Sequence, residues 1–277
     1  MKQFLTTMAG VFAGLVLFLV GVPFLLIVMA AGAAKPAPTP SHAVLELDLR
    51  DPLTDQDPVN PFASIGRRSM SVMSVIETLE RARKDGKVKA VLVRLPEGGM
   101  TPASADEIRL ALKKFRAAGK AVYAHSQGLY PSGMVASTYM LGSAADEFWM
   151  QPGASLQVTG VASEDLFLKR FIDKYGVKAD YEQRYEFKNA VNPYLYSDYT
   201  PAHREAQLSW MGSIYGATLL NAAGDRKQQP QALRASLERG PYQAEDALKL
   251  KLIDKVGQVK DAETAILAKA GKGAELV

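Results

Sequence analysis

The chain has 277 residues, of which 48% are hydrophobic and 22% charged, so it is long enough to bury one large core. Its formal net charge is only +4, and the basic residues are scattered among acidic ones, which gives no support to nucleic-acid binding. It has no cysteine, which excludes disulfides, thiolate metal sites and a cysteine nucleophile.

The N-terminal stretch is apolar over a length that fits a membrane span. Residues 4–34 carry no charge, and residues 11–29 are almost continuously apolar. A signal-peptide core has about 7–15 apolar residues, whereas a span needs about 20. We therefore expect residues 1–35 to be a retained transmembrane anchor, with a signal segment as the alternative. Residues 36–42 are expected to be a Pro/Ala linker, and residues 43–277 a single domain.

Strand and helix patterns alternate through the first half of the domain. Alternating or continuous apolar runs predict strands, helical spacing of apolar residues predicts helices, and a Pro/Asp/Asn-rich stretch at 51–65 predicts a loop. The expected strands are 43–49, 88–95, 121–124 and 147–150, and the expected helices are 71–84, 104–118 and 133–145. A capping box, Ser104 with Glu107, is predicted to start the second helix. Repeated β-α-β units imply parallel strands joined by right-handed crossovers.

The second half is predicted to be more helical. An apolar stripe at helical spacing indicates a helix over 163–175, followed by a polar, strand-like segment over 178–186. Thr200 and Pro201 have the residue types of a helix N-cap and first position, so a long helix is expected from there to about residue 222. A short helix is expected over 243–250.

The residues exclude several chemistries. The three histidines, His42, His125 and His203, are far apart without ligand spacing, so we expect no metal site and no cofactor. There is no Gly-x-Ser-x-Gly elbow and no phosphate-binding loop. The pair Gly98-Gly99 after a strand is either a plain turn or a source of backbone N–H groups for an oxyanion.

Lys188 lies at the centre of the stretch 185–194, Tyr-Glu-Phe-Lys-Asn-Ala-Val-Asn-Pro-Tyr. Its neighbours Tyr185, Phe187 and Val191 are apolar or aromatic, and burial among such side chains lowers the pKa of a lysine. A lysine with a lowered pKa can act as a general base near neutrality. The alternative interpretation is an ordinary surface lysine between a strand and a loop.

The order of these segments resembles the signal peptide peptidase A (protease IV) family, from about residue 43 to 259. The stretch around Lys188 is similar to the motif that carries the family's catalytic lysine, and it is the most specific part of the resemblance. The other similar segments are 88–95 with Gly98-Gly99, 107–112, 118–124, 139–146 with Pro152-Gly153, 240–248 and 252–254.

The resemblance implies an α/β, ClpP/crotonase-like fold of repeated β-α-β units, preceded by one transmembrane helix. It implies a serine peptidase with a Ser-Lys dyad that degrades residual signal peptides, without a cofactor. Lys188 would be the general base, and Gly98 or Gly99 would supply N–H groups to the oxyanion. The implied location is the bacterial inner membrane, single-pass, with the catalytic domain on the periplasmic side. The implied partners are hydrophobic peptides, the membrane, and other copies of the chain or a second domain of the same kind, without nucleic acid.

The sequence departs from the family at the nucleophile. Alignment without gaps through 139–146 places Ala136 on the serine position. Ser132 lies four residues earlier, one helical turn or about 5.4 Å away, and is interpreted as a helix N-cap, with a nucleophile in a helix shifted by one inserted turn as the alternative. Ser137 is one position off, rotated by about 100° around the helix.

A long form of the family has two tandem copies, of which the first carries the lysine and the second the serine. The intact lysine motif and the missing serine resemble the first copy, so we expect this chain to supply the general base to a serine in a second domain or copy. The alternative is a non-catalytic anchored scaffold, or a peptide-binding member of the same fold.

Overall fold

The computed structural model describes residues 1–33, 40–57 and 70–277. They form two compact units, Met1–Thr39 and Pro40–Val277. The first part of the expected linker 36–42, up to residue 39, lies outside the described residues, as does the expected loop from residue 58 onward.

The first unit is one apolar helix. It consists of α1 (Lys2–Val16), a π-helical turn (Leu17–Gly21) and α2 (Val22–Ala33). The stretch Lys2–Met29 has 28 residues and is the one helix of the described chain that is long and apolar enough to cross a membrane. At 1.5 Å per residue it measures about 42 Å, against about 30 Å for a hydrocarbon core. A signal sequence has the same length and composition, so the helix fits either an anchor or a signal.

A six-stranded parallel sheet forms the centre of the second unit. Its order is β7-β4-β3-β2-β1-β8, and every neighbouring pair is parallel, as the β-α-β pattern predicts. The strands are β1 (Ala43–Asp48), β2 (Val88–Arg94), β3 (Ala121–Ser126), β4 (Glu147–Met150), β7 (Lys255–Val256) and β8 (Glu275–Leu276). Strands β1 to β4 match the four expected strands. They are recognisable in the sequence because a strand buried on both faces is a nearly continuous apolar run.

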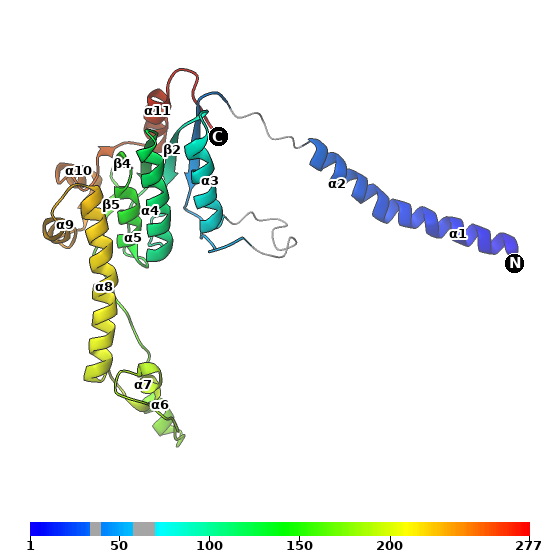
Figure 1. The fold of residues 1–277 in the computed structure, drawn as a ribbon. Helices are drawn as coiled ribbons and strands as arrows, with labels where there is room; N and C mark the ends of the chain where they lie inside the picture. The colour runs from blue at the N-terminus through cyan, green and yellow to red at the C-terminus, as the bar shows by residue number, and fades with distance from the viewer. Residues whose placement is uncertain (34–39, 58–69) are drawn as a thin grey trace. The chain divides into compact units, whose positions relative to one another are not determined.

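Helices cover both faces of this sheet. On one face α3 (Val72–Lys84), α4 (Pro102–Ala117) and α5 (Val135–Ser143) lie side by side, whereas α11 (Val259–Ala270) packs on the other (Figure 1). The side chains of β2 alternate between the two faces of the sheet. Val91 and Val93 belong to the larger of two hydrophobic cores, whereas Ala90 and Leu92 belong to the smaller core, which includes residues of α11. A pair of short antiparallel strands, β5 (Ser155–Leu156) and β6 (Tyr242–Gln243), and the helices α9 (Pro230–Leu237) and α10 (Ala244–Lys249) complete this part of the unit.

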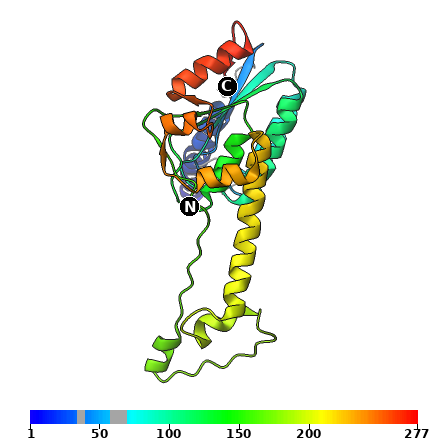
Figure 2. The ribbon, with the colours of Figure 1, turned by 90° about the vertical axis from the view of Figure 1, so that its left-hand side faces the viewer.

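A long helix carries a second region away from the sheet. Helix α8 (Pro201–Asp225) packs its C-terminal half on α5, with Tyr215, Leu219 and Ala222 buried. At its N-terminal end lie α6 (Lys169–Lys174), a 3-10 turn (Asn189–Val191) and α7 (Asn192–Leu195), remote from the sheet in both views (Figures 1 and 2). We call residues 160–214 the arm and the remainder of the second unit the body.

Several elements differ from the sequence-based expectation. Helix α4 begins at Pro102 with Thr101 as its cap, and Ser104 donates its N–H to Thr101 instead of opening a capping box with Glu107. The helix expected over 163–175 is limited to Lys169–Lys174, and 178–186 forms no strand. The arm departs most because two residues of its apolar stripe, Leu166 and Phe171, are largely exposed, so periodicity alone does not fix a helix there.

Candidate active site

Lys188 lies in the arm and is exposed to solvent. It follows an irregular loop in which Tyr185 has a positive φ of 67°, and its own N–H donates to the Tyr185 carbonyl at 3.2 Å. Tyr185 and Phe187 are themselves 69% and 50% exposed. The expectation that its neighbours bury this lysine is therefore wrong for the chain by itself, because Tyr185 and Phe187 remain largely exposed and do not close over it. Its role as a base stays a prediction.

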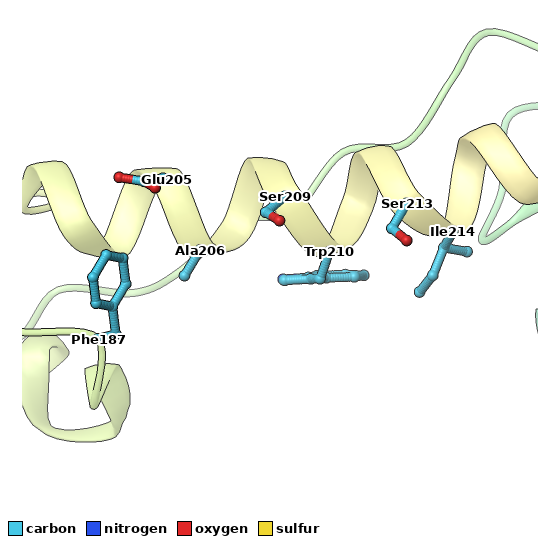
Figure 3. Close-up of a pocket in the computed structure, with 7 residues that line it drawn as sticks. All are labelled: Phe187, Glu205, Ala206, Ser209, Trp210, Ser213 and Ile214. Atoms are coloured by element: carbon cyan, nitrogen blue, oxygen red, sulfur yellow. The ribbon is translucent and has the colours of Figure 1, made fainter.

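A groove runs along α8 beside Lys188. Phe187 points from the lysine loop towards the helix, and Ala206, Trp210 and Ile214 project from the same side of α8 (Figure 3). The groove has a volume of about 460 Å³, and its remaining walls are Glu205, Ser209 and Ser213. The groove thus combines two aromatic side chains, Phe187 and Trp210, with smaller ones from α8, and Phe187 directly precedes Lys188 in the chain.

Gly98 and Gly99 lie in a different place, at the carboxyl ends of the strands. This is the usual position of ligand sites in parallel sheets. They line a cleft of about 300 Å³ together with Leu49, Arg50, Asp51, Pro52, Leu53, Pro96, Met100, Thr101, Ser104 and Ser132. At its rim Arg50 pairs with Asp48 at 2.5 Å, and this hydrogen bond lowers the pKa of the Asp48 carboxyl.

The two glycines differ in what they can donate. The Gly99 N–H already donates to the Ser132 carbonyl at 2.6 Å, and a Cβ on Gly99 would lie 2.1 Å from the backbone nitrogen of Met134. Gly99 is therefore required for the close approach of two backbone segments, and its N–H is engaged. The oxyanion role therefore stays a prediction for Gly98, which lines the cleft.

The three candidate nucleophile positions lie at the start of α5. The helix begins at Val135 with Met134 as its N-cap, so Ser132 is not the N-cap that the sequence predicts. Ala136 and Ser137 are buried, and the Ser137 hydroxyl has no hydrogen-bond partner in the described chain. Ser132 is exposed and lines the cleft. Only Ser132 of the three presents a hydroxyl to solvent.

The structure thus brings together Gly98, Gly99 and Ser132 but not Lys188. The first three line the cleft in the body, whereas Lys188 directly precedes the turn and α7 at the far end of α8 (Figure 2). A base must lie within about 3.2 Å of the hydroxyl that it deprotonates, or somewhat further without substrate. No dyad is assembled within the described part of this chain.

The histidines and acidic residues offer no alternative centre. His125, which directly follows the expected strand 121–124, is the fifth residue of β3. It is buried with Nε2 bonded to the Gly257 carbonyl, and burial lowers the pKa of its imidazole. No group of three or more metal-ligating residue types is found in the described ranges. Sequence analysis missed two residues, Gln183 and Asn192, whose side-chain amides form hydrogen bonds at the lysine loop. No pattern in the sequence distinguishes them from ordinary loop residues.

Comparison with known proteins identifies the family of the chain. The model of peptidase family S49 matches residues 114–272, which include β3, α5, the whole arm and Lys188. Protease 4 of Salmonella typhi is 26% identical over 263 residues, covering 88% of this chain and 42% of that protein. Protease 4 of Haemophilus influenzae is 29% identical over 227 residues, covering 78% of this chain and 35% of that protein. The chain spans less than half the length of these relatives. Its parallel sheet with flanking helices is the ClpP-like fold, and the chain belongs to peptidase family S49.

Proposed function

We propose that this chain is the base-donating part of a membrane-anchored serine peptidase, in which a second S49 domain or copy supplies the nucleophile. The observation that carries the proposal is the separation of the two functions. The lysine motif is intact and its lysine is exposed, whereas the position aligned with the serine is the buried Ala136. A second domain that presented a serine to the arm would complete the dyad.

The chemistry follows from a neutral lysine. The Lys188 amine takes the proton of a serine hydroxyl while the serine oxygen attacks the scissile carbonyl carbon. The resulting ammonium then protonates the amine of the leaving peptide, and water hydrolyses the acyl-enzyme by the same route. N–H groups at the serine's own cleft would stabilise the oxyanion. Contact with the second domain would also remove water from Lys188, which favours its neutral form.

The proposed substrates are hydrophobic peptides, of which the remnants of signal peptides are one source. The apolar helix Lys2–Met29 supports attachment to a membrane. We further propose the bacterial inner membrane as the location, with the body and arm on the periplasmic side. Extraction with alkaline carbonate tests the attachment, and recovery of a soluble product that begins near residue 35 would contradict it.

A fluorophosphonate probe tests the source of the nucleophile. The full chain in detergent should give no adduct, whereas the complex purified through this chain from its own membranes should be labelled on a serine of another S49 domain. That labelling should disappear in Lys188→Met and in Lys188→Arg, because a guanidinium stays protonated and cannot act as a base. Lys178→Met, which removes another exposed lysine of the arm, is the matched control.

The outcomes separate the alternatives. An adduct on Ser132 that requires Lys188 would show that the dyad is complete within copies of this chain. Absence of any labelled serine in the complex would favour the non-catalytic scaffold.

A further inference from the structure

The arm is unusual in what it buries. Across residues 160–214, all of which the structure describes, the buried residues are Asn192 and His203, and both are polar. Polar side chains are buried when hydrogen bonds compensate the loss of water. Asn192 is 1% exposed and lies four residues after the solvent-exposed Lys188, and these two residues flank the same 3-10 turn. The question is what this buried amide holds in place.

Asn192 joins three separate segments. Its Nδ2 donates to the Asn189 Oδ1 at 3.3 Å and to the Thr200 Oγ1 at 3.5 Å. Its Oδ1 accepts a hydrogen bond from the Gln183 Nε2 at 3.0 Å. Thr200 is the N-cap of α8 and accepts the N–H of His203 at 3.2 Å. The network therefore starts at the N-terminus of the 25-residue helix that connects the arm to the body.

The network ends on the lysine itself. The Gln183 Nε2, which bonds Asn192, also donates to the backbone carbonyl of Lys188 at 2.7 Å. Residues 178–184 before it form no helix or strand, and Lys188 has φ −85° and ψ 75°, outside the helical region. Apart from the bond of its N–H to the Tyr185 carbonyl, the hydrogen bond that holds the backbone of Lys188 comes from the Gln183 side chain.

We infer that Gln183 and Asn192 are positioning residues for Lys188: they fix the backbone of the lysine loop to the N-terminus of α8, so that the exposed amine meets its nucleophile in one orientation. This inference rests on the proposed role of Lys188 as the base. A side chain of four methylenes amplifies a small change at its Cα, and a misplacement of about 1 Å can cost about 100-fold in rate. A fully bonded polar network selects a single conformation of a loop that has little apolar packing.

The sharpest variant is Gln183→Met, which keeps the length of the side chain and removes the donor to the lysine carbonyl. Its matched control is Gln228→Met, because the Gln228 Nε2 also donates to a lysine carbonyl, that of Lys251 in the body, at 3.0 Å. Asn192→Leu removes the central amide, but this residue is buried and the variant can fail to fold. Gln183 is half-exposed, so its replacement tests the network without that difficulty.

Two measurements are made on each variant. Hydrogen exchange of the full chain in detergent should accelerate at least tenfold over residues 183–192 in Gln183→Met and remain unchanged over α4 and α5. In the peptidase complex, kcat should fall by about 10–100-fold with KM within twofold of the parent, since the base is misplaced and the substrate contacts are kept. Gln228→Met should leave both quantities as in the parent.

The results are read against Lys188→Met in the same complex. If Lys188→Met is inactive and Gln183→Met shows both changes, the positioning role is supported. Unchanged exchange over 183–192, or faster exchange with unchanged kcat, would overturn it while leaving the function of Lys188 intact. Full activity of Lys188→Met would instead overturn the proposed function, and with it any positioning role.

Discussion

The body and the arm differ in whether their large apolar side chains are buried or exposed. In the body, Phe115, Tyr139 and Phe148 are completely buried between the sheet and its helices. In the arm, Leu166, Phe171 and Tyr185 are 76%, 62% and 69% exposed. Exposed large apolar side chains are typical of interaction sites where they form a contiguous patch. The body thus packs a core of its own, whereas the arm exposes apolar side chains together with the predicted base.

The first prediction measures this difference directly and has the largest expected effect. Phe115→Ala should lower the free energy of unfolding by about 3–5 kcal/mol, because it leaves a cavity in a packed core. Phe171→Ala, the same substitution in the arm, should change it by less than about 0.5 kcal/mol. Urea unfolding of the full chain in detergent checks both. A cost above about 2 kcal/mol for Phe171→Ala would show that the arm has a core of its own.

A second prediction concerns the close contact of two backbone segments in the body. Gly99→Ala places a Cβ 2.1 Å from the Met134 nitrogen, and neither backbone can move away without disturbing α5, so we expect destabilisation by about 3 kcal/mol. Gly86→Ala is the control, because its Cβ would meet no atom within 4 Å. Thermal unfolding distinguishes them, and equal melting temperatures would contradict the contact.

The third prediction uses pH. Burial lowers the pKa of His125 below its usual 6.5, so the unfolded chain binds a proton that the folded chain does not. The contribution of this histidine to stability is therefore complete above pH 6.5 and is lost as the pH falls below it, by up to about 1.4 kcal/mol per pH unit. His125→Gln should flatten the loss of stability between pH 7 and 5. An unchanged slope in urea titrations at these two values would show that His125 does not contribute.

The smallest effect is expected in the arm, and it has the opposite sign. Gly212 lies within α8, where an added Cβ would meet nothing within 4 Å. Gly212→Ala should stabilise the helix by roughly 0.5–1 kcal/mol, because alanine loses less backbone entropy than glycine. Slower hydrogen exchange across α8 is the readout. Faster exchange would show that this helix face is more closely packed than the structure has it.

The sequence predicts the body far better than the arm, for a physical reason. Strand β2 is recognisable because burial on both faces demands a continuous apolar run. The stripe at 163–175 gives only the short α6, because Leu166 and Phe171 are largely exposed. An apolar periodicity predicts a helix through the burial of its apolar face, and it misleads where the structure leaves that face exposed.

The same limit applies to the candidate site. The motif identifies Lys188 and the glycine pair by residue type, but not their separation, the engaged N–H of Gly99 or the exposure of the lysine. Those properties depend on contacts between residues far apart in the sequence. The hydrogen bonds of Gln183 and Asn192 are equally invisible in the sequence, since amides in a loop have many ordinary uses.

The order of the sheet has a consequence for synthesis on the ribosome. Its two outermost strands, β7 and β8, are both made by residues after 254, and they cover the open sides of β4 and β1. Until those residues leave the exit tunnel, a nascent chain exposes unpaired N–H and carbonyl groups along both edges of its apolar sheet. Such open edges can pair with other strands and lead to misassembly. The chain therefore depends on late-made segments to protect its earliest strand, and a nascent chain stalled before them is a natural client for chaperones.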